Sequence, residues 1–273
     1  MNAEVFLPTY NGARFLPEAI RSLPLDRLTV IDDASTDDTV AIARRIGAKV
    51  VENTTRAGLT GNWNRALRMA TAEAFVIAHQ DDVYDASFLD AMTALLASRP
   101  RAFAAHAKSR YIDERGAAID SPAARYKERF WPGDEPYERD PADELRALQG
   151  GNYIIAPSVI FRTAAVREIG AFDESYQFVP DWDYWVRGLL AGFTIAGTHA
   201  RLVSWRRHAE TATAAQERSL ARYEEEVRIL ASLAERAGFA PRFEAVENTL
   251  LSDFAARLAA GDRDGARALL RFA

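Results

Sequence analysis

Short, mainly apolar runs alternate with helical patterns along the first part of the chain. Each run is typical of a buried strand, and the runs lie at 4–7, 28–31, 49–52, 75–78, 102–105 and 159–162. After the first run, apolar residues recur with the spacing of one helical face, at Leu16, Ala19, Ile20 and Leu23. This alternation predicts an α/β fold, in which a mostly parallel central sheet carries helices on both faces.

The alternation stops in a long segment from about Asp113 to Pro141. This segment is rich in Pro, Arg, Asp and Glu, and it carries scattered aromatic residues at Tyr126, Phe130, Trp131 and Tyr137. Long irregular segments in compact domains are often lids or binding loops, and a disordered excursion is the alternative. Aromatic residues are scarce in disordered segments, so the composition favours an ordered loop over a binding site.

The last part of the chain changes character again. Two further strands are predicted at 193–195 and 202–205, and from about residue 213 the pattern indicates three helices rich in Ala, Glu, Arg and Leu. We therefore divide the chain into a domain at 1–210 and a C-terminal helical extension at 211–273. The extension carries no recognisable chemistry. Its expected roles are packing on the core, dimerisation, or binding of a partner or a membrane face.

Composition removes several classes of function. The chain has 273 residues and a net charge of −5, which favours neither nucleic acid nor an anionic membrane as a partner. It has no cysteine, so disulfides, thiolate metal sites and a cysteine nucleophile are excluded. No signal peptide is recognisable, and no apolar run approaches the ~18 residues that span a bilayer. We expect a cytoplasmic protein, and no feature of the sequence points to an oligomer.

Two acidic residues, Asp81 and Asp82, directly follow the strand predicted at 75–78. Adjacent carboxylates repel each other and resist burial unless water or a cation is near. In open α/β sheets, ligands bind beyond the carboxyl ends of the strands. The pair therefore predicts a hard divalent cation, Mg²⁺ or Mn²⁺, shared with substrate phosphates. An acidic loop that caps the next helix is the alternative.

Acidic residues also follow the second predicted strand. Ser35 and Asp38 have the spacing of a capping box, which would start the next helix. This interpretation does not explain Asp32 and Asp33, which precede the cap. Carboxylates in this position commonly accept hydrogen bonds from a nucleoside.

Two candidates lie later in the chain. Asp181 stands at the start of a predicted helix, where it is either an N-cap or a general base. His208 follows a strand and two arginines, Arg206 and Arg207. It is either structural or directed at phosphates or a metal.

Taken together, five segments resemble motifs of the inverting family 2 glycosyltransferases, which have a Rossmann-like GT-A fold. In chain order, the segments are Pro8–Asn11, Val30–Thr39, His79–Tyr84, Gly170–Asp183 and Arg206–His208. The resemblance covers about residues 1 to 210. Any one motif is weak, but five in order at plausible separations are specific.

The resemblance implies a role for each matched residue. The nucleoside would be held by the first-strand motif and by two acids of the later motifs, namely Pro8, Thr9, Tyr10, Asn11, Asp33 and Asp81. The metal, Mn²⁺ or Mg²⁺, would be bound by Asp81 with support from Asp82 and His208. Asp181 would be the catalytic base, and His79 and Arg206 would contact the diphosphate or another part of the donor.

This chain departs from the family pattern at two positions. His79 stands where an Asp is usual, and its imidazole can still contact ribose or metal. Pro180 stands where a Glu often precedes the catalytic Asp, which leaves Asp181 without that neighbour.

The resemblance implies a metal-dependent transfer, with inversion, of a sugar from a UDP- or dTDP-linked donor to a hydroxyl of a saccharide or lipid-linked acceptor. The variant at Gln80–Tyr84 is similar to that of family members that build bacterial surface polysaccharides, which places the reaction at the inner face of the cytoplasmic membrane. Because of His79, a catalytically inactive nucleotide-sugar-binding protein is the main alternative. A sugar-nucleotide pyrophosphorylase would need a Gly-rich phosphate loop where this chain has Pro8–Asn11.

Overall fold

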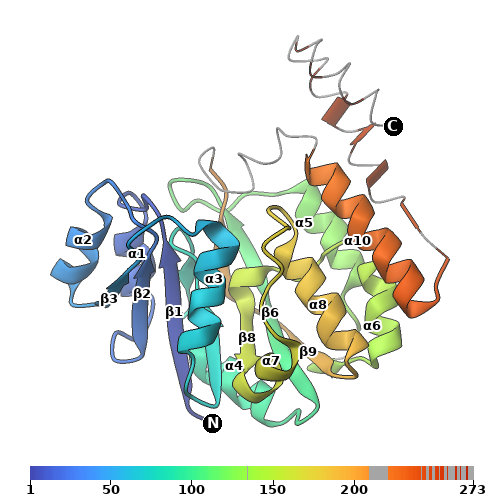
Figure 1. Cartoon of the computed structure of the whole chain (residues 1–273), viewed down its shortest axis with the longest axis horizontal. Helices are drawn as coiled ribbons and strands as arrows, with labels where there is room; N and C mark the ends of the chain where they lie inside the picture. Colours follow the sequence, from blue (N-terminus) through green and yellow to red (C-terminus); the bar gives the residue numbers. More distant parts are fainter. Residues whose placement is uncertain are drawn as a thin grey trace.

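The computed structural model describes residues 1–133, 135–208 and 221–240, together with separate positions between 242 and 269. One mixed sheet forms its centre, in the strand order β3-β2-β1-β4-β8-β6-β9-β5, with β7 paired to β9 (Figure 1). The predicted α/β class, with helices on both faces of the sheet, is confirmed. Within the described residues, no helix is both long and apolar enough to cross a membrane.

The first half of the sheet is parallel. β1 (Ala3–Thr9) lies between β2 (Leu28–Asp32) and β4 (Ala74–Ile77), and β3 (Lys49–Glu52) pairs with β2. All four strands were predicted, because each is a compact apolar run that ends at a polar turn. Parallel pairing brings their carboxyl ends to the same edge of the sheet, where Thr9 is the register partner of Asp32.

The second half of the sheet is mixed. β8 (Val159–Arg162) runs antiparallel between β4 and β6 (Ala102–Ile112), and β9 (Thr194–Arg206) runs parallel to β6. Two short antiparallel strands also pair with β9 and were not predicted, namely β5 (Val83–Tyr84) and β7 (Tyr137–Glu138). They are too short to show a hydrophobic period.

The prediction of separate strands at 193–195 and 202–205 was wrong. β9 is continuous across the polar stretch between them, since β6 is long enough to pair with both ends. The register shifts at Ala107/Lys108 and Lys108/Ser109 absorb the irregularity. The sequence shows only the apolar ends of this strand, because its middle is partly exposed.

Two helical layers cover the sheet (Figure 1). One hydrophobic cluster includes residues of α1 (Leu16–Arg21), α2 (Thr39–Ile46) and α4 (Phe88–Ala97). The opposite cluster includes residues of α3 (Gly58–Met69), α6 (Pro141–Leu148), α7 (Thr163–Ile169), α8 (Pro180–Leu190) and α10 (Ala221–Ala237). Neighbouring residues of β1 divide between the layers, Val5 into the first cluster and Phe6 into the second, because side chains alternate along a strand.

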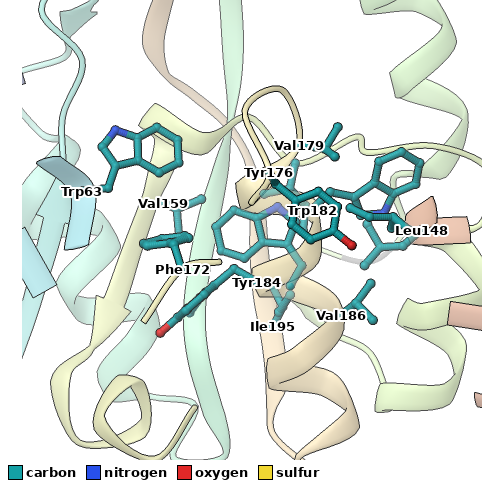
Figure 2. Close-up of a cluster of buried hydrophobic side chains, with 14 of the residues drawn as sticks. Trp63, Leu148, Val159, Phe172, Tyr176, Val179, Trp182, Tyr184, Val186 and Ile195 are labelled. Carbon is teal, nitrogen blue, oxygen red and sulfur yellow. The ribbon is translucent and has the colours of Figure 1, made fainter. Parts of the chain in front are cut away.

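Helix α8 is held in place by its aromatic residues (Figure 2). Trp182, Tyr184 and Trp185 are all buried, and the ring of Trp185 stacks on Phe161 of β8 with centroids 5.8 Å apart. Aromatic side chains bury large apolar areas, so they fix the position of the helix against the sheet. Asp181 precedes Trp182 directly and is therefore carried by a rigid element.

The irregular segment from Asp113 to Pro141 contains ordered elements. Among its described residues are α5 (Pro122–Lys127), a short 3₁₀ turn at Glu128–Phe130 and β7. The Tyr126 hydroxyl donates to the backbone oxygen of Gly150 at 2.7 Å, and the Lys127 ammonium donates to that of Asn152. The prediction of an ordered loop fits these contacts better than a disordered excursion does.

The C-terminal region is described only in part. α10 is one of the three predicted helices, and it packs against α8 and α6. Tyr223, Ile229, Leu230 and Leu233 of α10 are buried in the same cluster as α8. The predicted boundary at 210–211 and most of the other two helices lie outside the described residues, and the division into two parts stays a prediction.

Candidate active site

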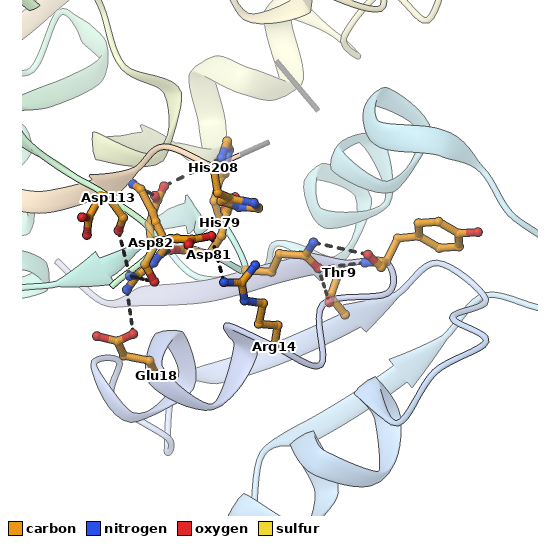
Figure 3. A network of polar contacts seen from close by, with 12 residues as sticks. Thr9, Arg14, Glu18, His79, Asp81, Asp82, Asp113 and His208 are labelled. Carbon is orange, nitrogen blue, oxygen red and sulfur yellow. Dashed lines mark hydrogen bonds and ion pairs between the residues drawn. The ribbon is translucent and has the colours of Figure 1, made fainter. Parts of the chain in front are cut away.

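The turn after β1 and the loop after β4 are joined by one side chain. The Gln80 side-chain oxygen accepts hydrogen bonds from the Thr9 hydroxyl at 2.5 Å and from the Tyr10 amide at 3.0 Å. Its amide nitrogen donates to the Tyr10 carbonyl at 3.3 Å. Figure 3 shows this junction beside the acidic loop. Gln80 was not predicted as a site residue, although it lies inside the motif at 79–84.

Asn11 connects the same turn to the loop after β2. Its φ of 46° is left-handed, a conformation that Asn adopts more readily than most residues. Its amide donates to the Ser35 hydroxyl at 2.9 Å, and its side-chain oxygen accepts from the Thr36 amide at 2.8 Å. Pro8 precedes this turn inside β1. Together, these contacts place all four residues of the first motif at the carboxyl edge.

The buried carboxylate of Asp33 joins β2 to the start of α3. One of its oxygens accepts from the Asn53 side chain and from the Ala57 amide, both at 2.7 Å, and the other accepts from the Gly58 amide at 2.9 Å. A carboxylate offers about four acceptor positions, and three are used here. The remaining one is on the oxygen that accepts from Gly58.

The predicted capping box at Ser35 and Asp38 was wrong. The Ser35 hydroxyl donates to the Asp32 carboxylate at 2.5 Å. Ser35 therefore binds the turn that follows β2 and does not cap α2. The first amide of α2 is bound instead by Asp37, whose carboxylate accepts from the Thr39 amide at 3.0 Å. Sequence spacing does not decide which of several neighbouring polar side chains reaches a free amide.

The acidic pair after β4 is divided between two environments. Asp82 is completely buried, and burial and the charge of Asp81 raise its pKa well above the ordinary value. One Asp82 oxygen accepts from the Arg206 amide at 2.8 Å, and the other has no hydrogen-bond partner. Asp81 is partly exposed. Neither acid caps α4, because Asp85 accepts from the Ser87 amide at the start of that helix.

His79 completes a possible ligand set with the two acids. Ligand atoms of His79, Asp81 and Asp82 lie within 4.8 Å of one another. The His79 ring packs on Trp63 at 5.5 Å, and its Nε2 is buried without a partner. Burial lowers the pKa of His79, so the imidazole is neutral at pH 7 and able to bind a metal, although the charge of Asp81 opposes this shift. Asp82 Oδ2 lies 4.0 Å from His79 Nδ1, and these two atoms beside the Asp81 carboxylate fit a divalent cation.

Arg206 and His208 hold this loop from the end of β9 (Figure 3). The Arg206 guanidinium is buried and donates to the Asp81 carbonyl at 2.8 Å, to the Glu18 carboxylate at 2.6 Å, and to the carbonyls of Asp113 and Glu114. His208 Nε2 lies 3.0 Å from the Asp81 carboxylate. Arg206 is thus directed at the protein itself, and its predicted donor contact stays a prediction, as does metal binding by His208.

Asp181 lies in the first turn of α8, one residue after Pro180. The helix starts at Pro180 with Val179 as its N-cap, so the interpretation of Asp181 as the N-cap was wrong. Its carboxylate accepts from the Asn152 side chain at 2.9 Å and from the Trp182 amide at 2.8 Å. Burial raises the pKa of Asp181, and the Asn152 hydrogen bond and the charge of Lys127 act against this rise.

The charge of Lys127 acts on Asp181. Burial lowers the pKa of Lys127 to about 8, and the charges of Asp181 and Arg207 also act on it, the first raising and the second lowering its pKa. Lys127 is therefore near both Asp181 and the segment that carries His208. Neither Lys127 nor Asn152 was predicted as a site residue, because neither belongs to a sequence motif.

Comparison with known proteins shows a consistent group of relatives. The model of the family "Glycosyl transferase family 2" matches residues 4–163. An uncharacterized glycosyltransferase of Rickettsia typhi is 25% identical over 232 residues, which are 81% of this chain and 68% of that protein. An uncharacterized protein of Mycobacterium tuberculosis is 27% identical over 223 residues, or 75% of this chain and 66% of its own length. This chain thus spans about two thirds of these relatives.

Solved structures show the same fold. TarS 1-349 of S. aureus in complex with UDP-GlcNAc matches with a TM-score of 0.66 and 18% identity, over 86% of this chain and 66% of that one. The mannosyltransferase PcManGT from Pyrobaculum calidifontis, in complex with GDP-Man and Mn²⁺, matches with a TM-score of 0.63 and 21% identity, over 98% and 78%. At these identities, the likeness concerns the fold and not the substrates.

Proposed function

The chain belongs to glycosyl transferase family 2, and on that premise we propose that it transfers a sugar from a nucleotide diphosphate-sugar to an acceptor hydroxyl with inversion at the anomeric carbon. The observation that carries this proposal is the meeting of His79, Asp81 and Asp82 at the carboxyl edge of the sheet. Such an edge is where open α/β sheets bind their ligands.

The nucleoside would lie over the turns that follow β1 and β2. Tyr10 presents a ring there that is covered by the Arg56 guanidinium at 3.8 Å, and Asp33 has one acceptor position left. A uracil or thymine N–H would suit that position, so UDP- and dTDP-sugars are the first donors to test. TarS in complex with UDP-GlcNAc is a relative in fold that binds a uridine nucleotide.

The metal would be held by Asp81 and Asp82, with His79 as a nitrogen ligand and His208 beside Asp81. Carboxylates suit Mg²⁺ and Mn²⁺, whereas imidazole suits transition metals, so this set favours Mn²⁺. Once bound, the ion would neutralise charge on the diphosphate leaving group. The fit rests on Asp82 Oδ2, which has no hydrogen-bond partner and lies 4.0 Å from His79 Nδ1.

Asp181 would act as the general base. The acceptor oxygen attacks the anomeric carbon, the bond from that carbon to the diphosphate oxygen breaks, and the acceptor proton passes to Asp181. Direct displacement inverts the anomeric carbon. Burial raises the pKa of Asp181 toward the operating pH, which makes it a more effective base than an exposed Asp. Asn152 orients the carboxylate through its hydrogen bond at 2.9 Å.

The acceptor in this proposal is a saccharide or a lipid-linked saccharide at the cytoplasmic face of the membrane, in the synthesis of a bacterial surface polysaccharide. The segment from Asp113 to Pro141 would border the acceptor, because α5 carries Lys127 to the surroundings of Asp181. The similarity of the motif at 79–84 to members of that type supports this assignment.

A nucleotide-sugar-binding protein without transfer activity is the second candidate, and His79 motivates it. Thermal unfolding with UDP, dTDP, GDP and CDP, each with and without Mn²⁺, tests the donor site directly. A ligand at ~100 times its Kd adds about 2.7 kcal/mol to the free energy of unfolding. Stabilisation by one nucleotide that needs Mn²⁺ is the expected result, and no stabilisation by any nucleotide would contradict the proposal.

Nucleotide binding is expected of both the transferase and the inactive binding protein, so a measurement of turnover is needed to distinguish them. Release of the nucleoside diphosphate from the matching donor, by hydrolysis or in the presence of an acceptor mixture, is expected of the transferase. Binding without any release would favour the second candidate.

A further inference from the structure

Helix α10 lies against the segment that leads into α8, although more than forty residues separate them in the chain. In Figure 1, α10 runs beside α8 and α6. It lies well beyond residues 4–163, the part of the chain that the family model matches. Its buried residues Tyr223, Leu230 and Leu233 belong to the hydrophobic cluster that contains Trp182 and Val186 of α8.

One carboxylate of α10 binds three consecutive backbone amides before α8. Glu225 accepts from the amides of Gln177 at 2.9 Å, Phe178 at 2.7 Å and Val179 at 3.2 Å. Its exposed fraction is only 9%, so water does not replace these hydrogen bonds. The next residue is Pro180, which has no amide hydrogen. Glu225 therefore binds the last three backbone donors before the helix that carries Asp181.

Two arginines of α10 hold the same loop from either side of Glu225. The Arg222 guanidinium lies over the Phe178 ring at 4.9 Å, and that of Arg228 lies over the Tyr176 ring at 3.8 Å. Arg228 also donates to the Ser175 carbonyl at 3.4 Å. Cation–π contacts of this kind strengthen where the cation is partly desolvated. The backbone between Ser175 and Val179 is thus fastened to α10 at several points.

Hydrogen bonds from backbone amides to a carboxylate are about twice as strong as those between neutral groups. Without Glu225, the amides at 177–179 would lose these bonds, and the loop that leads into the first turn of α8 would be held less firmly. Because Asp181 stands in that first turn, a shift of the loop moves its carboxylate away from the Asn152 side chain and from the acceptor.

We propose that Glu225 is a positioning residue for Asp181, and that α10 is therefore part of the catalytic unit. The proposal rests on the proposed function, in which Asp181 is the general base. Glu225 does not contact the reacting atoms and acts through the loop at 175–179.

The test compares Glu225→Ala, Glu225→Gln and the control Glu224→Ala in the full chain. Glu224 is the exposed neighbour of Glu225 on α10, so this control removes the same charge outside the loop contact. Steady-state kinetics with the donor separate kcat from KM. Hydrogen exchange of the amides at 177–179 reports on the contact itself.

Glu225→Ala should lower kcat by about 10- to 100-fold, the size of effect expected for a small misplacement of a catalytic group. The KM for the donor should stay near the wild-type value, because Glu225 binds the amides at 177–179 and none of the residues assigned to the donor. Exchange at 177–179 should accelerate. Glu225→Gln keeps one acceptor oxygen, so its kcat should lie between those of the wild type and Glu225→Ala. Glu224→Ala should match the wild type in every measurement.

Wild-type kcat in Glu225→Ala, or unchanged exchange at 177–179, would overturn the proposal. A rise in donor KM of about 10- to 100-fold with unchanged kcat would also overturn it. If Glu225→Ala does not fold, Glu225→Gln decides by the same measurements. Failure of the proposed function is seen separately, as wild-type turnover in Asp181→Asn, whereas the exchange measurement on Glu225→Ala does not depend on that result.

Discussion

The imidazole of His208 lies 3.0 Å from the carboxylate of Asp81, although 127 positions separate them in the chain. His208 lies two residues after the end of β9, and Asp81 follows β4. The two are brought together because Arg206, two residues before His208, donates to the Asp81 carbonyl and to Asp82. The loop that carries Asp81 and Asp82 is therefore held by the buried Arg206. These hydrogen bonds fix the two acids in position before a ligand binds.

Asp181→Asn should abolish most turnover and leave the donor site intact. Asn keeps the shape and can still accept a hydrogen bond from the Trp182 amide, but it cannot take the acceptor proton. General-base catalysis contributes ~10²–10⁴-fold, so kcat should fall by about that factor. Nucleotide affinity, measured by calorimetry, should stay at the wild-type value. Turnover close to wild type would remove Asp181 from the mechanism.

Asp81→Asn should remove the metal-dependent part of nucleotide binding. The substitution takes away one negative charge from the set formed with His79 and Asp82. The rise in Tm that a nucleotide produces in Mn²⁺ should then shrink to the value found after treatment with EDTA. Asp90→Asn, an exposed acid on α4, is the matched control and should keep the full rise. A full metal-dependent rise in Asp81→Asn would show that the ion is bound elsewhere.

The pH dependence of kcat/KM should report on the surroundings of Asp181. A base must be deprotonated to act, and burial raises the pKa of Asp181, so activity should fall on the acid side at a pH above the ordinary range of Asp. Asn152→Ala removes a hydrogen bond that lowers this pKa. Its acid limb should therefore move to higher pH, with activity partly recovered there. If the fall in activity of Asn152→Ala on the acid side occurs at the same pH as in the wild type, Asn152 does not act on Asp181.

Lys127→Met should move the acid limb in the same direction. The positive charge of Lys127 lowers the pKa of Asp181, and its own pKa is lowered to about 8 by burial. Above that pH, Lys127 loses its charge, so the difference between variant and wild type should be largest below pH 8. Profiles that differ equally at all pH values would contradict an electrostatic role.

Leu230→Ala should destabilise the whole protein and not α10 alone. Leu230 is fully buried in the cluster that includes α8, and large-to-small substitutions at such sites cost about 2–5 kcal/mol of unfolding free energy. Denaturant unfolding followed by tryptophan fluorescence and by far-UV circular dichroism should give one coincident transition at lower denaturant. Leu251→Ala, at a residue that is 67% exposed, is the control and should change stability little. Two separate transitions would indicate that α10 unfolds independently.

The sequence alone determined the four strands of the parallel half and the candidate acids at their carboxyl ends. Each strand of the parallel half is a local apolar run, and hydrophobic period is a local property that needs no knowledge of distant contacts. Asp33 and Asp81 could be named as candidates because each follows such a run. The α/β class was predicted for the same reason, the family was predicted from the resemblance of five motifs, and both are confirmed.

Only the tertiary structure decided which polar groups meet. Gln80 joins two turns 70 positions apart, Asn152 reaches Asp181 across 29, and Glu225 reaches Phe178 across 47. None of these pairs has a period or a spacing in the sequence. The same limit explains the failed capping box, because Asp32, Ser35 and Asp37 all offer oxygen atoms within a few residues.

The physical reason is the difference in range between the two kinds of interaction. Burial of apolar side chains repeats with the period of the backbone, so a short window of sequence reveals it. A hydrogen bond forms only where donor and acceptor meet within about 3 Å, and folding sets that distance. The sequence thus specified the strands of the parallel half and the candidate acids, whereas the packing of α10 and β9 around them decided which acids are held in place and by which residues.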